Sequence, residues 1–137
     1  MADEIIMKVR TEDPIDFTVA NAIAIPKGSM CKMTDERTAV LSNGDTDIVA
    51  GVTARDKIAS DGRTQLAIFR GGICEGTAGV AGVTFGKAII TDSSTSSANR
   101  LVDADVGSEN IVGTCLKTAA SGARFQFELN PIVVNLA

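Results

Sequence analysis

The chain has 137 residues, of which 45% are hydrophobic and 22% are charged, a balance typical of one globular domain and unlike that of disordered or fibrous chains. The net charge of -4 and the lack of any Lys- or Arg-rich stripe argue against nucleic acid or an anionic membrane as a partner. The apolar runs are too short to span a bilayer, and the acidic start of the sequence is unlike a signal peptide, so we expect synthesis in a cytoplasm without secretory export.

The first segment, residues 1–14, predicts an extended N-terminal arm or an edge strand. Acidic and apolar residues alternate from Met1 to Asp13, and Pro14 forces the residue before it into an extended or turn conformation. A frayed terminus explains the same pattern equally well. Residues 15–137 are predicted to form a single β-rich domain.

Short apolar segments follow Pro14, separated by turn-forming residues at Gly28, Ser42 to Asp45, Asp61-Gly62, Gly71-Gly72, Gly86, Gly107 and Ser121-Gly122. This spacing predicts many short strands rather than helices. The run from Arg63 to Arg70 is mostly apolar and predicts a strand buried on both faces, and Asp61-Gly62 before it suits a tight hairpin.

The segment Arg124 to Asn130 alternates strictly and predicts a strand with Phe125, Phe127 and Leu129 on one face. Pro131 interrupts this pattern, so the residues after it are expected to form an edge strand or a tail. The best helical candidate is the short segment Leu116 to Ser121, and the polar tract Ser93 to Asn99 predicts a surface loop. The expected fold class is therefore all-β with a minor helix.

Two parts of the chain share an order of features about sixty residues apart. Ile25-Pro-Lys-Gly28 resembles Val83-Thr-Phe-Gly86, Ile48 to Gly51 resembles Ile111 to Gly113, and each part ends on a strand after a glycine turn. Neither part buries its apolar faces alone, so the pattern favours a small barrel or sandwich made from two similar halves. Chance likeness between glycine-rich β sequences is the alternative.

Catalytic and metal-binding chemistry has little support in this sequence. There is no histidine, which excludes Ser-His-Asp and Cys-His centres and histidine-containing zinc sites. The cysteines Cys31, Cys74 and Cys115 are widely spaced among apolar or small residues and are interpreted as reduced, buried thiols. We therefore predict no enzyme, no cofactor and no metal site.

Several weaker patterns have plainer explanations. Asp45 with Asp47, and Asp103 with Asp105, lie in turn-like stretches and are interpreted as solvated turn residues, with a weak cation site as the alternative. Ser29-Met-Cys-Lys32 matches the S-x-x-K motif of serine acyl-enzymes but lies in a predicted strand, where the Ser and Lys side chains would face opposite sides. The glycine-rich stretch from Gly71 to Gly86 lacks the residue spacing of a phosphate-binding loop. No Trp or Tyr is present, and most of the five phenylalanines, at positions 17, 69, 85, 125 and 127, are expected to be buried.

The succession of glycine-and-aliphatic motifs from Phe17 to Leu129 resembles the head-decoration, or capsid cement, proteins of tailed bacteriophages. The motifs that carry the resemblance are Ile25-Pro-Lys-Gly28, Ile48-Val-Ala-Gly51-Val-Thr, Arg63-Thr-Gln-Leu-Ala-Ile-Phe-Arg-Gly-Gly-Ile73, Val83-Thr-Phe-Gly86-Lys-Ala and Asn110-Ile-Val-Gly113. They are loose spacings and not catalytic signatures.

The resemblance implies a structural virion protein that binds the outside of an icosahedral head and stabilises its lattice, as a homotrimer whose partner is the major capsid protein. In such proteins the N-terminal arm or nearby loops often contact the shell. By position and pattern we assign a capsid-binding role to Ile5, Ile6, Met7 and Val9, through strand addition or apolar burial. The main alternative is a cellular β-barrel binding or assembly module of unknown ligand, and a carboxylate-based enzyme is the second.

Overall fold

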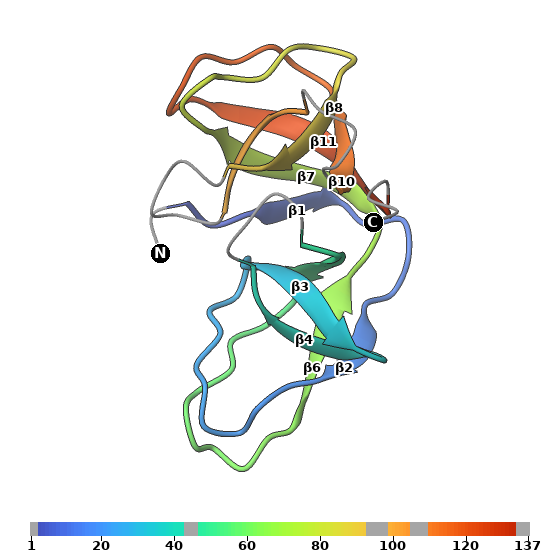
Figure 1. Cartoon of the computed structure of the whole chain (residues 1–137), viewed down its shortest axis with the longest axis vertical. Helices are drawn as coiled ribbons and strands as arrows, with labels where there is room; N and C mark the ends of the chain where they lie inside the picture. Colours follow the sequence, from blue (N-terminus) through green and yellow to red (C-terminus); the bar gives the residue numbers. More distant parts are fainter. Residues whose placement is uncertain (1–2, 43–46, 93–98, 105–109, 134–137) are drawn as a thin grey trace.

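The computed structural model describes residues 3–42, 47–92, 99–104 and 110–133 (Figure 1). In these residues the secondary structure is all β, and no helix is present. β1 (Ile6–Val9) comes first in the chain and pairs into the sheet of the second half. The strands of the first half are β2 (Ile15–Thr18), β3 (Met30–Asp35), β4 (Thr38–Leu41), β5 (Val49–Thr53) and β6 (Gln65–Phe69). Those of the second half are β7 (Gly72–Ala78), β8 (Ala88–Thr91), β9 (Arg100–Asp103), β10 (Ile111–Cys115) and β11 (Arg124–Ile132).

The two halves are built from the same circuit of strands. In the first half the order β2-β4-β3-β5-β6 closes into a barrel. In the second half β7, β11, β10, β8 and β9 lie in one sheet, and an additional β7–β9 pairing joins its ends into a ring. Each circuit contains one parallel pair, β2 with β4 and β7 with β9, and its other pairs are antiparallel. The internal repeat predicted from the sequence is confirmed.

Equivalent loops close with equivalent hydrogen bonds. Ile25 and Lys57 form an isolated antiparallel bridge in the first half, and Val83 and Ala119 form its counterpart in the second. Figure 1 shows these long loops at opposite ends of the molecule, with β1 between the two halves. The loops therefore project away from the junction of the halves.

One glycine in each half lets neighbouring strands approach closely. A Cβ on Gly51 would lie 2.0 Å from the carbonyl oxygen of Phe69, and a Cβ on Gly113 would lie 1.9 Å from that of Glu128. Both glycines sit beside irregularities in the pairing of β5 or β10 with a neighbour. A side chain at Gly51 would push β5 away from β6, and one at Gly113 would push β10 away from β11.

The core is divided between the halves but continuous at their junction. One cluster fills the first barrel around Phe17, Leu66 and Ile68. The larger cluster fills the second half and includes Met30, Val49 and Val52 from the first. Because β5 also contacts β10 and β11, the outer face of the first barrel packs against the interior of the second ring.

A buried amide fixes this junction. Asn99, at the end of the tract predicted to be a surface loop, is only 5% exposed. Its Oδ1 accepts a hydrogen bond from the Met30 amide at 2.8 Å, and its Nδ2 donates to the Gly28 carbonyl at 3.2 Å. Residues 93–98 of the tract lie outside the described residues. The predicted loop therefore ends in a buried contact between the halves.

Lys57 is a buried charge that the sequence did not reveal. Its side chain is 0% exposed and its Nζ lies 2.9 Å from Asp61 Oδ1. Nζ also donates to the carbonyls of Asn21 at 2.8 Å and Ile58 at 2.7 Å. Three oxygen partners offset the desolvation of the ammonium group, and the arrangement ties the two outer loops of the first half together.

The predicted strands are confirmed with some corrections. In β11, Phe125, Phe127 and Leu129 are buried while the residues between them are exposed. The strand predicted from residues 63–70 is β6, but it alternates instead of being buried on both faces, and a long loop rather than a tight hairpin precedes it.

Pro131 and the expected minor helix also need correction. Pro131 does not end its strand, because β11 continues to Ile132, which is opposite Ile111. The predicted helix at Leu116 to Ser121 is wrong. Ala119 is instead held by its bridge to Val83, and this contact from the other loop overrides a short local preference for helix.

Candidate partner-binding surface

The four residues predicted to bind a capsid lie on or beside β1, which is an edge strand and not a free arm. β1 pairs antiparallel with β7, with Ile6 opposite Glu75, Met7 opposite Cys74 and Val9 opposite Ile73. The edge-strand interpretation of the N-terminal segment is confirmed, and the fold divides the four side chains between its core and its surface.

Ile5 belongs to the core. It is 2% exposed, and its amide donates to the Gly28 carbonyl at 2.9 Å. Gly28 has a φ of +78°, and a Cβ there would lie 2.4 Å from Glu4 Cγ and 2.6 Å from the Ile5 carbonyl oxygen. This glycine lets the first barrel contact the chain just before β1. Ile5 is therefore covered by both halves and presents no surface to a partner in this fold.

Met7 is half-buried, and Ile6 and Val9 are exposed. Met7 packs against the core of the second half, with its Sδ 3.9 Å from Cys74 Sγ. Ile6 is 40% and Val9 49% exposed. The pairing shifts between Met7 and Val9, and this irregularity breaks the simple alternation that would have put Val9 on the same face as Met7. Ile6 and Val9 are the members of the predicted set that a partner could contact.

A groove of about 320 Å³ runs beside β1, between the N-terminal segment and the first barrel. Val52, Thr53, Ala54 and Phe69 line it from the first barrel, and Glu4 to Lys8 together with Arg10 line it from the N-terminal segment. The Arg10 guanidinium lies 5.6 Å from the Phe69 ring centroid and 2.6 Å from Asp13 Oδ1. Sequence reasoning missed the β5 and β6 contributions because nothing in those segments indicates that the N-terminal segment packs beside them.

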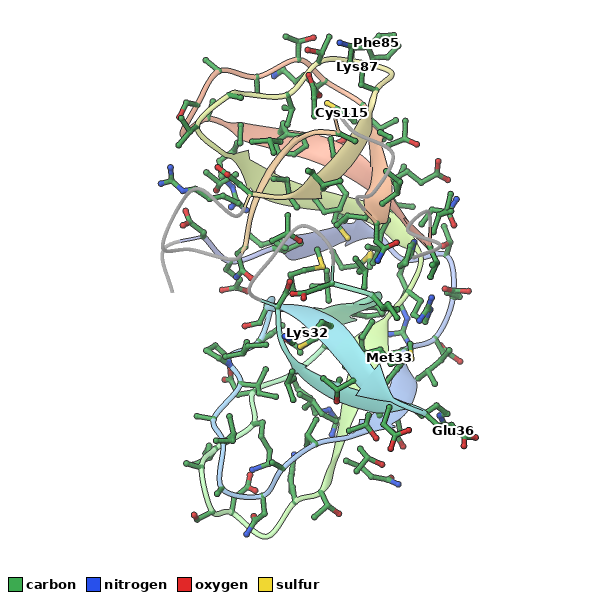
Figure 2. All side chains as sticks on the ribbon, viewed as in Figure 1. Lys32, Met33, Glu36, Phe85, Lys87 and Cys115 are labelled. Atoms are coloured by element: carbon green, nitrogen blue, oxygen red, sulfur yellow. The ribbon has the colours of Figure 1, made fainter. Side chains whose placement is uncertain are left out.

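Other exposed apolar side chains lie in the loop between β7 and β8 of the second half. Val80 is 62% and Phe85 68% exposed, and Figure 2 shows Phe85 with Lys87 in this loop. The prediction that most phenylalanines are buried is confirmed for Phe17, Phe125 and Phe127, whereas Phe69 is half-buried and Phe85 is exposed.

The three cysteines are free, buried thiols, as predicted. Burial raises the pKa of Cys31 and of Cys74 to about 12. The pKa of Cys115 is also raised, mainly by burial and further by the Asp103 carboxylate, against the hydrogen bond to the Lys117 carbonyl. Thiols with such pKa values are protonated at neutral pH and are poor nucleophiles.

The acidic pairs and the Ser-Lys pattern take part in structural contacts. Asp47 accepts a hydrogen bond from Ser42 and lies 3.6 Å from Lys32 Nζ, and Asp103 accepts one from the Thr84 amide. Asp45 and Asp105 lie outside the described residues.

Ser29 and Lys32 are held by separate contacts. Ser29 Oγ donates to the Pro26 carbonyl at 2.7 Å, whereas Lys32 Nζ faces Asp47. Among the residues with described positions, no group of three or more acidic or cysteine side chains is arranged to hold a metal ion. The same part of the chain has no helix long and apolar enough to cross a membrane.

No protein-family model matches this chain, and no curated protein sequence does so either. A solved structure does: the head fiber gp8.5 N base of bacteriophage phi29, with a TM-score of 0.56 and 15% sequence identity. The match covers 90% of this chain and 98% of that one. The two chains therefore share an all-β fold over nearly their whole lengths.

Proposed function

We propose that this chain is a structural protein of a bacteriophage head, bound to the outside of the shell. The observation that carries the proposal is the shared fold with a phage head fiber base, which extends through both halves and includes nearly all of that base. Because one fold serves many functions, the likeness supports the role by analogy.

The chemistry of the chain supports a role that needs no reaction. The sequence has no histidine, and its thiols are buried and hard to ionise. The carboxylates that could have formed a catalytic pair serve turns and strand ends in the described residues. A non-enzymatic function is the one that these side chains favour.

The contact with the shell is proposed to lie along β1 and the adjoining groove. Ile6 lines the groove and Val9 is exposed at the end of β1, and the cationic side chains of Lys8 and Arg10, which are paired with Glu75 and Asp13, also line the groove. The major capsid protein is the proposed partner. Ile5 and Met7 act indirectly, because their burial holds β1 on β7. Apolar side chains beside a charged rim are a common composition for a protein interface.

Stabilisation of the head lattice is proposed to come from repeated binding of trimers. A trimer that contacts neighbouring shell subunits gains avidity, so each single contact need not be strong. Light scattering on the purified chain tests the trimer. The melting temperature of heads with and without the chain tests the stabilisation.

The proposed location is tested first on virions. Mass spectrometry and immunogold labelling of particles from the producing phage are expected to find the chain on the outer surface of heads. The gene is expected beside those for a major capsid protein and a head protease. A chain absent from virions, stable as a monomer and indifferent to heads would support the alternative of a cellular binding module.

The proposed contact is tested by co-sedimentation with heads that lack the chain. Deletion of residues 1–10 would be ambiguous, because it removes Ile5 from the core. The double substitution Ile6→Lys, Val9→Lys changes only exposed side chains and is expected to weaken binding at least tenfold. Val80→Lys, in the loop between β7 and β8, is the matched control and is expected to leave binding unchanged. Equal binding by all three proteins would refute a contact along β1.

A further inference from the structure

The two halves differ at one strand edge, that of β7 in the second half and of β2 in the first. An additional strand covers this edge in the second half only. In the second half β7 pairs with β9 only at Thr77 and Ala78, and the next part of the same edge is covered by β1, from Ile73 to Glu75. In the first half β2 pairs with β4 only at Thr18. No strand of the described residues continues along that edge past Asp16. A position that is filled in the second half is open in the first.

The hydrogen bonds that frame β2 and β7 define their equivalence. The Val19 amide donates to the Thr64 carbonyl, as the Ala78 amide donates to that of Ala123. Counting back from these bonds, Asp16 corresponds to Glu75 and Ile15 to Cys74. The strand pairings agree with this correspondence. Asp16 is opposite Ala67 on β6 and Glu75 is opposite Gln126 on β11, and these two partners lie equally far along the sequence from Thr64 and Ala123.

The missing strand leaves an apolar side chain uncovered. Cys74 is 0% exposed, and Met7 of β1 lies against it with 3.9 Å between the sulfur atoms. Ile15, at the equivalent position, is 42% exposed. A side chain placed over Ile15 as Met7 is placed over Cys74 would remove this apolar surface from water.

The backbone of Asp16 also faces the open side. The Thr18 amide donates to the Arg37 carbonyl at 2.6 Å, so Thr18 points toward β4. Residues two apart in a strand direct their backbone groups to the same side, so Asp16 does likewise. Its carbonyl accepts a hydrogen bond from Arg37 Nη2 at 2.5 Å. The exposed Arg37 side chain thus occupies the place that the N–H of a further strand would take.

The space beside this edge is shallow and short. Residues of β2, β6 and the β3–β4 turn enclose a hollow of about 190 Å³. Figure 2 shows Glu36, one of the lining residues, at the tip of that turn. Pro14 has no N–H, so the backbone groups that a new strand could pair with are the Asp16 N–H, the Pro14 carbonyl and, once the Arg37 side chain is displaced, the Asp16 carbonyl. A segment of three or four residues fits this edge, as β1 fits β7.

We propose that the edge of β2 at Asp16 accepts an extended segment of a partner protein, added antiparallel as β1 is added to β7. The N-terminal segment of this chain already lies on β7, and we assign the added strand to another protein. Its chemistry follows from β1, in which Met7 covers Cys74 and Lys8 Nζ lies 3.6 Å from Glu75 Oε2. The added segment carries an apolar residue over Ile15 and a cationic residue facing Asp16.

The inference deepens the proposed function, on which it rests only for the source of the segment, an extended part of a head shell subunit. Strand addition of this kind gives affinity through main-chain hydrogen bonds and specificity through alternate side chains. It also gives the two halves different roles, one closed by its own chain and one open to a partner.

A peptide with the sequence of residues 3–10 tests the edge directly on the full chain. Amide shifts in nuclear magnetic resonance spectra are expected at Ile15 to Thr18 and at Arg37 as the peptide is added, and not along β7. Shifts confined to β7 would mean that the peptide only exchanges with β1 and would overturn the inference, as would the absence of saturable binding.

Two further changes examine the mechanism. Asp16→Pro removes the N–H that faces the open edge and is expected to weaken peptide binding at least tenfold without a matching loss of melting temperature. In β1 the Ile5 amide points away from β7, so that of Ile6 points toward it. A peptide N-methylated at the position of Ile6 is therefore expected to lose binding, whereas one methylated at the position of Met7 keeps it. Unchanged binding in the first two cases would refute strand addition.

The same Asp16→Pro variant separates this inference from the proposed function. If the unaltered chain binds heads and the variant binds them equally well, the edge of β2 is not the contact and the head-binding role stands. If the peptide binds at β2 but the chain is absent from virions, the edge accepts strands and the head-binding role fails.

Discussion

The role of Ile5 in joining the halves gives a quantitative prediction for Ile5→Ala. The substitution removes three carbons from a side chain that is 2% exposed and belongs to the core cluster shared by both halves. At about 0.8 kcal/mol per buried methylene the transfer term is about 2.4 kcal/mol. A cavity term brings the expected loss of unfolding free energy to about 3 to 4 kcal/mol, a fall in melting temperature of roughly 10 to 15 °C.

The matched control is Ile6→Ala, at the next residue, which begins β1. Ile6 is 40% exposed, so its truncation is expected to cost less than about 1 kcal/mol. Since the chain has no Trp or Tyr, urea unfolding is followed by far-ultraviolet circular dichroism rather than by intrinsic fluorescence. Equal losses for the two variants would show that β1 is not built into the core and would refute this account of the junction.

Three other predictions concern a closely packed glycine, an ion pair and the buried thiols. Gly113→Ala is expected to lower the free energy of unfolding by more than about 2 kcal/mol, because its Cβ would lie 1.9 Å from the carbonyl oxygen of Glu128 in β11. In the control Gly86→Ala, the Cβ has no atom within 4 Å and only the φ of +81° is unfavourable, so the expected loss, measured by urea unfolding, is about 1 kcal/mol. The hydrogen bond from Lys57 lowers the pKa of Asp61 from 3.8 to about 2, so the stability that this carboxylate contributes is complete above its unfolded-state pKa and is lost as the pH falls toward 2. The stability gap between the unaltered chain and Asp61→Asn should therefore close across that range, and a constant gap would argue against the ion pair. The three buried thiols should resist alkylation at neutral pH and react fully in denaturant, as mass spectrometry would show; rapid labelling of the folded chain would contradict their burial.

The sequence by itself determined the local features that depend on alternation and turn chemistry. The side-chain order in Phe125 to Leu129 sets one apolar face whatever the strand packs against, and this face is buried as expected. The repeated glycine and aliphatic spacing likewise indicated two similar halves, because each half needs the same turns to close the same circuit. The absence of histidine limited the chemistry of any site without reference to the fold.

Only the tertiary structure decided which similar segments are covered. Ile15 and Cys74 hold equivalent places, yet one is exposed and the other buried, because β1 lies on β7 and no described strand lies on the matching edge of β2. Lys57 and Asn99 are polar residues that a sequence reader places on the surface, and they are buried because carbonyl groups from distant loops meet them. Such contacts join residues far apart in the chain, so no local pattern records them. The N-terminal segment shows the same limit: its alternation predicted a strand, but only the packing of both halves around Ile5 made it part of the core.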